Sequence, residues 1–481
     1  MDHGPSPGFS EGDGGAPARP KLTRVNFNIL AALQRRHLLP ERPASSRPSH
    51  NPGDGLQDDL HGFTTLEEDG EESPDDGFPN WPVNKGNTRT PQALPPQKCS
   101  LRNARRKGKK RFLREHQGLG NDETNPPVYI EHKITSWTSK KHSNLKMMTV
   151  YADFACLRAT KGAYWGIDRP ALKSAKPMRE LRKRLDLVNW QGRDAEWFID
   201  VNDNIVVVLA GRPSGPASDW DDVHKKVVEA MSEVRQVIRS SSNRRGNYKS
   251  VSVGLSHGGG QTEPAMLAVQ PGPISEAVNT LLQNRQVHRM VRYAGNAMGL
   301  HAPNMHEEYR NTFKRYFDLD PYRFRQVLPS VYPAFTFNLG PRTVTVEHYD
   351  SRNKANGWIA VTALGDFNPD KGGHLILREL GLLVRFPPGS TILFPSAVIR
   401  HGNAPIQKGE FRMSITSYAA GALFQYADYG FSLKKRAKWE NPELYARMKE
   451  MQEGAWERAL KIYSKYDEVL QDRARVFGTK A

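Results

Sequence analysis

Short apolar runs alternate with turn residues between Phe335 and Tyr418. Each run is a few residues long and rich in branched or aromatic side chains, which is typical of β-strands. The runs predict about eight strands, at Phe335–Leu339, Val344–His348, Trp358–Leu364, His374–Leu377, Leu382–Phe386, Thr391–Phe394, Val398–His401 and Arg412–Tyr418. Glycine, proline and asparagine separate them and supply the turns. About eight short strands with no helix between them favour a double-sheet jelly roll, whose mouth can gather residues far apart in sequence.

Apolar residues recur at helical spacing in the segment that precedes these strands. The spacing predicts one helix from Trp220 to Ile238 and a second helix from Ile274 to Ala297. Their apolar positions are Trp220, Val223, Val227, Met231, Val234 and Ile238 in the first, and Val278, Leu281, Leu282, Val287, Met290 and Val291 in the second. We expect both helices to buttress one face of the barrel, which gives an α+β fold.

Weaker signals complete the expected folded region. Strand-like runs occur at Met147–Tyr151 and Ile205–Leu209, and Met178–Arg184 predicts a basic helix. Near the end of the chain, Asn441-Pro442-Glu443 combines a cap, an initial proline and an early acid. The segment from there to about Arg475 predicts one long charged helix. We expect that helix to pack through Leu444, Met448, Met451 and Leu460.

The first 125 or so residues have few apolar clusters and many prolines, which predicts mostly disordered chain. Asn26–Arg36 predicts a transient helix within it. An acidic run from Glu67 to Asp76 is followed by a dense basic block from Arg102 to Arg114. The basic block is interpreted as a nuclear-localisation or DNA-contacting patch, with a solvated charged linker as the alternative.

The net charge favours a nucleic-acid partner. Lys+Arg 69 against Asp+Glu 52 gives +17 at pH 7 and a pI near 9.7, which attracts phosphate backbones. Two cysteines, Cys99 and Cys156, are too few and too far apart to predict a disulfide framework. The sequence contains no apolar run that would predict a membrane span or a secretory signal. We therefore expect an intracellular protein and, with the basic block, a nuclear one.

His348-Tyr349-Asp350 is the first candidate for metal chemistry. On the predicted strand, His348 and Asp350 project from the same face, so one imidazole and one carboxylate converge. By itself the triplet is weak, because a strand histidine often only packs or meets solvent. His401, from a late strand, is the best third ligand. Two histidines and one carboxylate on one face of a metal are typical of non-haem Fe(II) oxygenases.

Arg412 indicates which co-substrate would accompany the iron. On a strand, Arg412, Ser414 and Tyr418 share one face, and an arginine on the inner face is costly to bury without a partner. A dicarboxylate such as 2-oxoglutarate would pair with its guanidinium, and Ser414 could add a hydroxyl donor. The alternative is an arginine at the barrel rim that pairs with a protein carboxylate.

Two loops between the predicted helices contain residues typical of phosphate binding. Ser240–Ser250 holds Arg244, Arg245 and Lys249 among small polar residues, which suits a phosphate contact or an ordinary surface loop. The Gly258–Gly260 run lacks the Lys-Ser/Thr of a P-loop, which excludes nucleotide hydrolysis of that kind.

Taken together, these motifs carry a family resemblance. Its elements are His348-Tyr349-Asp350-Ser351-Arg352-Asn353, Asn356-Gly357-Trp358, Gly372-Gly373-His374, Phe386-Pro387-Pro388-Gly389, His401, Arg412-Met413-Ser414 and Tyr418. The sequence resembles the TET/JBP family of 2-oxoglutarate and Fe(II)-dependent nucleic-acid base dioxygenases. It is most similar to the compact, transposon-associated forms of mushroom-forming fungi. The closest resemblance covers about Ser252 to Phe431.

The resemblance implies a fold and a division of the chain. It implies a double-stranded β-helix, the jelly-roll oxygenase core, at residues 251–432. A helical or mixed part of the catalytic domain would precede it at 126–250, after the disordered region 1–125. The charged C-terminal helix would occupy 433–481.

The resemblance also implies a role for each site residue. His348, Asp350 and His401 would hold Fe(II), and Arg412 and Ser414 would bind the distal carboxylate of 2-oxoglutarate. The implied places of the remaining three residues are His374 near the co-substrate, and Asn353 and Tyr418 at the target base. Local reasoning leaves alternatives open, because Asn353 could cap a turn and Tyr418 could belong to the core.

Two departures from the family pattern bear on the substrate. Animal members carry a second base-pocket histidine two residues after the tyrosine, where this chain has Ala420. They also carry a cysteine-rich zinc region, which two cysteines cannot build.

The resemblance implies oxidation of the methyl group of 5-methylcytosine in methylated duplex DNA, with 2-oxoglutarate and O2 consumed and the nucleotide flipped out. Hydroxymethylcytosine and further oxidised products would follow, and the protein is expected to be a monomer. One alternative is the same chemistry on N6-methyladenine, thymine, RNA or a protein side chain. Another is a catalytically inactive, transposon-derived DNA-binding module.

Overall fold

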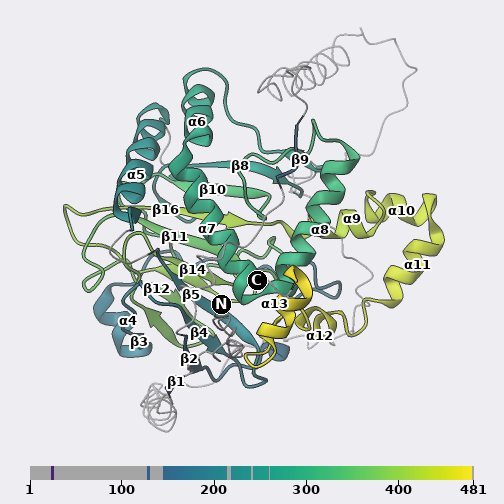
Figure 1. The fold of residues 1–481 in the computed structure, drawn as a ribbon, viewed down its shortest axis with the longest axis horizontal. Coiled ribbons are helices and arrows are strands. Elements are labelled where there is room, and N and C mark those ends of the chain that lie inside the picture. Colours follow the sequence, from purple (N-terminus) through teal and green to yellow (C-terminus); the bar gives the residue numbers. More distant parts are fainter. Residues whose placement is uncertain are drawn as a thin grey trace, which may run out of the picture.

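The structure is a computed structural model that describes residues 23–25, 127–130, 145–213, 218–239, 242–258 and 261–478. Figure 1 shows a mixed α+β fold, as the sequence predicts, with helices packed on extended sheets. The predicted Asn26–Arg36 helix, the acidic run and the basic block lie outside the described residues. They and the nuclear location stay predictions. Among the described residues, no helix is long and apolar enough to cross a membrane.

The larger sheet has the strand order β1-β2-β4-β5-β14-β11-β16-β10-β8-β9 within the described part of the chain. Its strands are β1 (Thr23–Val25), β2 (Lys146–Thr149), β4 (Glu196–Ile199), β5 (Ile205–Gly211), β8 (Ser250–Ser256), β9 (Ala265–Met266), β10 (Ala334–Asn338), β11 (Ile359–Asp366), β14 (Thr391–Phe394) and β16 (Phe411–Tyr418). All neighbours from β4 to β9 pair antiparallel, whereas β2 runs parallel to β1 and β4. Because β5 pairs with β14, the early strands extend the same sheet as the predicted barrel strands.

A smaller sheet has the order β15-β12-β13-β3. Its strands are β3 (Asp186–Val188), β12 (Leu375–Leu377), β13 (Leu382–Val384) and β15 (His401–Asn403). A separate hairpin joins β6 (Ser242–Asn243) to β7 (Gly246–Asn247). One large cavity is lined by residues of both sheets and of this hairpin. These strand pairings do not by themselves establish a jelly roll, so that topology stays a prediction.

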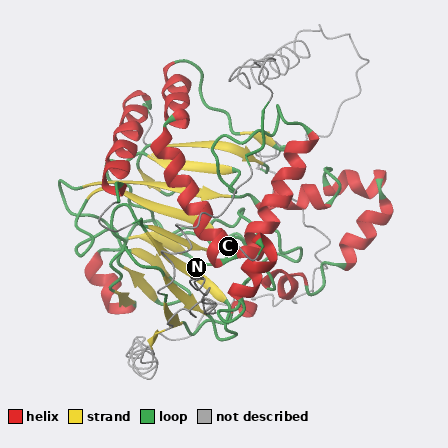
Figure 2. Ribbon diagram, in the orientation of Figure 1, coloured by secondary structure: helices red, strands yellow, loops and turns green. Residues whose placement is uncertain are grey.

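Helices cover the larger sheet, as Figure 2 shows. The helices of the described residues are η1 (Phe154–Cys156), α4 (Met178–Arg184), α5 (Trp220–Val237), α6 (Pro273–Gln283), α7 (Arg285–His301), α8 (Pro303–Leu319), α9 (Gly421–Asp428), α10 (Lys434–Glu440), α11 (Pro442–Glu450), α12 (Ala455–Leu460) and α13 (Val469–Phe477). Helix α7 packs on β5, β11 and β14, and α5 packs on β11. The apolar stripe predicted for α5 is buried from Trp220 to Val234. Helices α5 and α7 therefore buttress the sheet, as predicted.

The predicted helix from Ile274 to Ala297 is wrong in its continuity. It divides into α6 and α7 at Asn284, whose side-chain oxygen accepts hydrogen bonds from the backbone N–H groups of Gln286 and Val287. Such an N-cap begins a new helix even within a continuous apolar pattern. Helix α8 follows directly and was not predicted.

The predicted C-terminal helix is also wrong, because it divides into α11, α12 and α13. Gly454, before α12, adopts a left-handed conformation with φ 62°. Trp456 and Tyr463 are buried after this break, whereas Met451, which we predicted to pack, is 51% exposed. Burying these aromatic side chains stabilises the folded protein more than continuing the helix would.

Two of the predicted barrel strands also differ. Val344–His348 forms no strand, and the one isolated bridge found within it pairs His348 with His401. The segment predicted as Val398–His401 becomes extended only at His401, where β15 begins. Alternation in sequence identifies a face but not a pairing partner, so both errors are errors of strand pairing.

Candidate metal and co-substrate site

His348, Asp350 and His401 come together with their ligand atoms all within 4.8 Å of one another. All three side chains are buried. His401 opens β15, and His348 lies opposite it, because each backbone N–H donates to the other residue's carbonyl at 2.9 Å. The N–H of Asp350 donates to the carbonyl of Ser396 at 3.0 Å. Backbone pairing therefore fixes all three residues around one point.

Hydrogen bonds set the orientation of both imidazoles. Nδ1 of His348 lies 2.8 Å from the Val346 carbonyl, and Nδ1 of His401 lies 2.9 Å from the Ile399 carbonyl. Because a carbonyl only accepts, each Nδ1 carries a proton, which leaves Nε2 as the atom through which a neutral ring can bind a metal. Those Nε2 atoms lie 3.3 and 3.5 Å from the carboxylate oxygens of Asp350.

The protonation states suit a divalent metal. Burial, with the neighbouring His401, lowers the pKa of His348 to about 4, so its ring is neutral at pH 7. Burial alone would raise the pKa of Asp350, but Arg245 and His348 hold it well below its usual range. The Nε2 atoms of two imidazoles and one carboxylate therefore converge on one point. This donor set fits Fe(II) bound by three protein groups.

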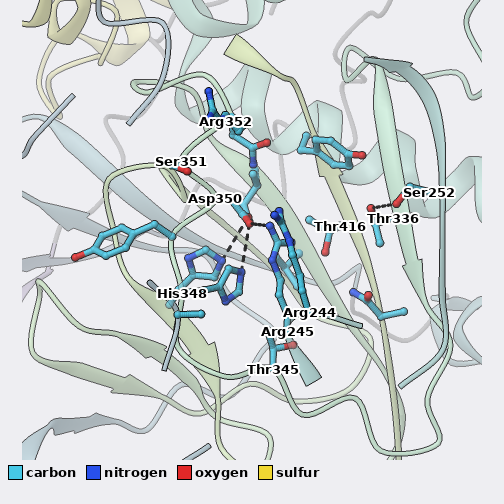
Figure 3. Close-up of a pocket in the computed structure, with 18 of the residues that line it drawn as sticks. Arg244, Arg245, Ser252, Thr336, Thr345, His348, Asp350, Ser351, Arg352 and Thr416 are labelled. Carbon is cyan, nitrogen blue, oxygen red and sulfur yellow. Dashed lines mark hydrogen bonds and ion pairs between the residues drawn. The ribbon is translucent and has the colours of Figure 1, made fainter. Parts of the chain in front are cut away.

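Arg245, which the sequence offered only as a possible phosphate contact, lies beside the metal ligands. It lies in the hairpin between β6 and β7, and its guanidinium forms an ion pair with Asp350, as Figure 3 shows. Its carbonyl accepts a hydrogen bond from the N–H of Val346 at 2.9 Å. A Cβ at Gly246 would lie 2.3 Å from the Val344 carbonyl oxygen, so the hairpin can approach this closely only with glycine there. The neighbouring Arg244 also lines the cavity.

The cavity around this point has a volume of about 1170 Å³. It brings together seven of the eight site residues predicted from the sequence, namely His348, Asp350, Asn353, His401, Arg412, Ser414 and Tyr418. On β16, the residues Arg412, Ser414, Thr416 and Tyr418 line the cavity, whereas Met413 and Ile415 are buried in the core. The alternation predicted for this strand is confirmed.

Arg412 is 3% exposed and has no carboxylate partner within the described residues. Its Nη1 donates to the Thr343 carbonyl at 3.1 Å, and its Nε is buried without a hydrogen-bond partner there. Burial lowers its pKa to about 10, so the guanidinium stays charged at neutral pH. The alternative of a rim arginine paired with a protein carboxylate is therefore not found in the described part of the chain. An anionic ligand in the cavity would supply the missing partner.

Ser414 and Asn338 form a polar pair beside Arg412. Nδ2 of Asn338 donates to Oγ of Ser414 at 3.0 Å, and both side chains line the cavity. The Ser414 hydroxyl acts as acceptor in this bond, so its proton can be donated to a ligand. Asn338 was not predicted, because its place on β10 becomes meaningful only when β10 pairs with β16.

His374 does not line this cavity. It is buried, with Nδ1 3.2 Å from the Gly372 carbonyl, and the charges near it are those of Asp370, Arg182 and Arg385. We predicted it as the first residue of a strand, but it directly precedes β12 and does not line the cavity that the other site residues share. We therefore assign it no part in co-substrate binding.

Lowering the pH from 7 to 4 is expected to destabilise the protein through His374. Burial lowers the pKa of His374 to about 4, whereas a histidine in an unfolded chain titrates near 6.5. Its contribution to stability is complete above pH 6.5 and is lost as the pH falls to 4, up to roughly 3 kcal/mol. Chemical unfolding at several pH values should show a shallower pH dependence for His374→Gln than for the wild type. If stability depended on pH equally in the two proteins, the pH effect could not be assigned to the burial of His374.

Asn353 and Tyr418 both line the large cavity. The N–H of Asn353 donates to the Asp350 carbonyl at 2.8 Å, and its side-chain amide donates to Oγ of Ser396 at 3.0 Å. Asn353 therefore both ends a turn and lines the cavity. Tyr418 is half-buried, and burial raises the pKa of its hydroxyl. Ala420 also lines the cavity, where its side chain offers no hydrogen bond.

Comparison with known proteins gives only distant likenesses. No protein-family model and no curated protein matches the chain. Among solved structures, NgTET1 in complex with 5mC DNA is 14% identical with a TM-score of 0.37, and the match covers 49% of this chain and 82% of that one. An oxidoreductase of the 2OG-Fe(II) oxygenase family from Burkholderia pseudomallei is 13% identical with a TM-score of 0.25, covering 44% and 94%. The function is therefore argued from the residues of the site.

Proposed function

We propose that the protein is an Fe(II) and 2-oxoglutarate-dependent dioxygenase that oxidises the methyl group of 5-methylcytosine in DNA. The observation that carries the proposal is a pairing within one cavity. Three buried metal-ligand side chains converge in it, and a buried arginine without a carboxylate partner in the described residues lines it as well. The arginine is of no use to a purely structural protein, because its Nε is buried without a hydrogen-bond partner in the described residues.

The chain's residues have distinct tasks in this proposal. His348, Asp350 and His401 hold Fe(II), which, together with 2-oxoglutarate and O2, supplies an oxidant able to attack an unactivated methyl group. Arg412 binds the distal carboxylate of 2-oxoglutarate through charge-assisted hydrogen bonds, and Ser414 donates its hydroxyl proton to the same group. Because Arg412 is buried, its attraction for the carboxylate is screened little by water.

The size and charge of the cavity support a nucleic-acid substrate. Pockets for one small molecule are roughly 300–1,000 Å³, so a cavity of about 1170 Å³ has room for 2-oxoglutarate and a flipped base. Arg169, Arg244 and Arg352 line it and are suited to the flanking phosphates. Asn353 offers a donor and an acceptor to a base edge, and Tyr418 offers a face for stacking.

The same chemistry on a different methylated base is the second candidate. Ala420 favours it, because this cavity position provides no side-chain hydrogen bond to a base. The test offers purified protein with Fe(II), 2-oxoglutarate and ascorbate a mixture of duplexes that contain 5-methylcytosine, N6-methyladenine or thymine. Mass spectrometry of the nucleosides should show oxidation of 5-methylcytosine first. Oxidation of N6-methyladenine alone would replace the proposed substrate and leave the iron chemistry standing.

Tyr418→Ala is expected to lower the rate of base oxidation about 10- to 100-fold, because stacking of a base on an aromatic ring is worth roughly 1–3 kcal/mol. Succinate should then form in excess of oxidised base, since the base is no longer held over the metal. Tyr445→Ala, on α11, is the matched control and should behave as the wild type. An unchanged ratio of succinate to oxidised base would assign Tyr418 to the core alone.

A further inference from the structure

A second cavity of about 240 Å³ lies behind the metal-binding segments. Glu347 and Arg400 line it, whereas the residues that follow each of them, His348 and His401, line the large cavity. The remaining lining residues are Leu172, Lys176, Glu180, Leu181, Arg184 and Arg378. The two cavities are therefore separated by the backbone that carries two of the metal ligands.

The lining of this second cavity has an excess of positive charge. It contains four basic side chains and two carboxylates, which leaves a net charge of +2. Glu347 is 2% exposed and accepts two hydrogen bonds from Arg378, one of them from Nε at 2.7 Å. Glu180 lies 3.5 Å from Lys176 and 4.0 Å from Arg184. Both carboxylates thus already have cationic partners.

Arg400 is the cation of this cavity that has no carboxylate partner in the described residues. Its Nε is buried and makes no hydrogen bond there, and its guanidinium lies 5.2 Å from the centre of the Tyr349 ring. A buried guanidinium nitrogen without an acceptor is unfavourable, and an oxyanion is the ligand that best satisfies it.

We propose that this cavity binds a phosphate group. Its volume corresponds to about eight water molecules, enough for one phosphate with part of its hydration but too little for a base as well. Arg400 contributes hydrogen bonds from its guanidinium, and Lys176 and Arg184 contribute charge from α4 and the segment before it. The phosphate can come from a free phosphate compound or from a nucleic-acid backbone.

A bound phosphate would act on the metal site through a short chain of contacts. The N–H of Arg400 donates to one oxygen of Glu379 at 2.6 Å, and the Tyr349 hydroxyl donates to the other at 2.5 Å. Tyr349 lies between His348 and Asp350 in the chain, and Arg400 precedes His401. Because the Arg400 guanidinium also lies over the Tyr349 ring, fixing this side chain restrains both segments that supply metal ligands. The proposal does not depend on the identity of the oxidised substrate.

The test is a titration of the full chain with inorganic phosphate at constant ionic strength. Calorimetry and 31P NMR measure the binding. We expect saturable binding at one site, weakened about tenfold or more in Arg400→Gln, which removes a charge-assisted contact. The variant should fold, because Arg400 has no ion pair whose loss would strand a buried carboxylate; a thermal melt checks this. Lys183→Gln, an exposed residue of α4 outside the cavity, makes the same charge change and should bind phosphate as the wild type does.

Absence of saturable phosphate binding by the wild type would overturn the proposal, as would equal binding by Arg400→Gln and Lys183→Gln. A competition arm distinguishes the sources of phosphate. If a short DNA duplex displaces phosphate, and Arg400→Gln weakens DNA binding more than Lys183→Gln does, the site takes a backbone phosphate. If DNA leaves phosphate bound, the site takes a free phosphate compound. Phosphate binding is measured without turnover, so its result stands even if the protein proves not to oxidise a base.

Discussion

Replacing Asp350 with asparagine is expected to lower the affinity for Fe(II) at least about 100-fold and to abolish turnover. Asparagine keeps the size of the side chain, but it removes the one negative charge that faces the two Nε2 atoms. A neutral amide is a far weaker metal ligand than a carboxylate. Removing a group that only hydrogen-bonds to a metal ligand already lowers metal affinity about 10- to 100-fold, so loss of the ligand itself should cost at least as much. The variant also leaves the buried side of Arg245 without its carboxylate.

Anaerobic calorimetry with Fe(II), and with Mn(II) as a redox-stable substitute, measures this affinity directly. The control is Asp366→Asn, an exposed aspartate at the end of β11 that makes the same chemical change away from the site. We expect one metal ion per chain in the wild type and in Asp366→Asn. Wild-type affinity in Asp350→Asn would contradict the metal assignment, even if the variant had lost activity.

Arg412→Met is expected to weaken 2-oxoglutarate binding about 100-fold while keeping or raising the melting temperature. A charge-assisted hydrogen-bonded pair is worth roughly 3 kcal/mol, which corresponds to about a hundredfold in affinity. The same substitution replaces a buried cation that has no carboxylate partner in the described residues with an apolar side chain of similar length, and such exchanges are often neutral or stabilising. A structural arginine would show the opposite pattern, with loss of stability and unchanged ligand affinity.

Arg473 of α13 provides a matched control for this experiment. Burial lowers its pKa to about 10, as it does for Arg412, and its Nε donates to the Leu300 carbonyl. Arg473→Met should leave 2-oxoglutarate affinity unchanged, whatever it does to stability. Because the pKa of Arg412 is about 10, this residue stays charged between pH 6 and 8. Its contribution to the 2-oxoglutarate affinity of the wild type should therefore not change over that range. Equal ligand affinity in wild type and Arg412→Met would contradict the co-substrate assignment.

The sequence predicted those parts of the site that depend on one strand at a time. Alternation along β16 placed Arg412, Ser414 and Tyr418 on one face, and the structure has that face toward the cavity. The meeting of His348 with His401 was expected from a barrel, and the structure achieves it by a backbone bridge rather than within a regular strand. The geometry needed was therefore predicted correctly although the local secondary structure was not.

Contacts between distant segments were beyond sequence reasoning. Arg245 lies in a polar loop whose composition suits any surface, and its place against Asp350 depends on how the hairpin packs on Val344 and Val346. No periodic pattern records such packing, because it involves neither an apolar stripe nor a strand register. The exclusion of His374 from the cavity has the same cause, since the orientation of its side chain depends on the start of β12.

The most direct test of the proposed activity is the stoichiometry of oxidation on a duplex that contains one 5-methylcytosine. Wild-type protein with Fe(II), 2-oxoglutarate and ascorbate is allowed a small extent of turnover, and mass spectrometry quantifies succinate and oxidised nucleoside together. We expect about one succinate for each hydroxymethylcytosine formed, and neither product from Asp350→Asn. Succinate that accumulates with every 5-methylcytosine unchanged would contradict the nucleobase substrate, and full product from Asp350→Asn would contradict the metal site itself.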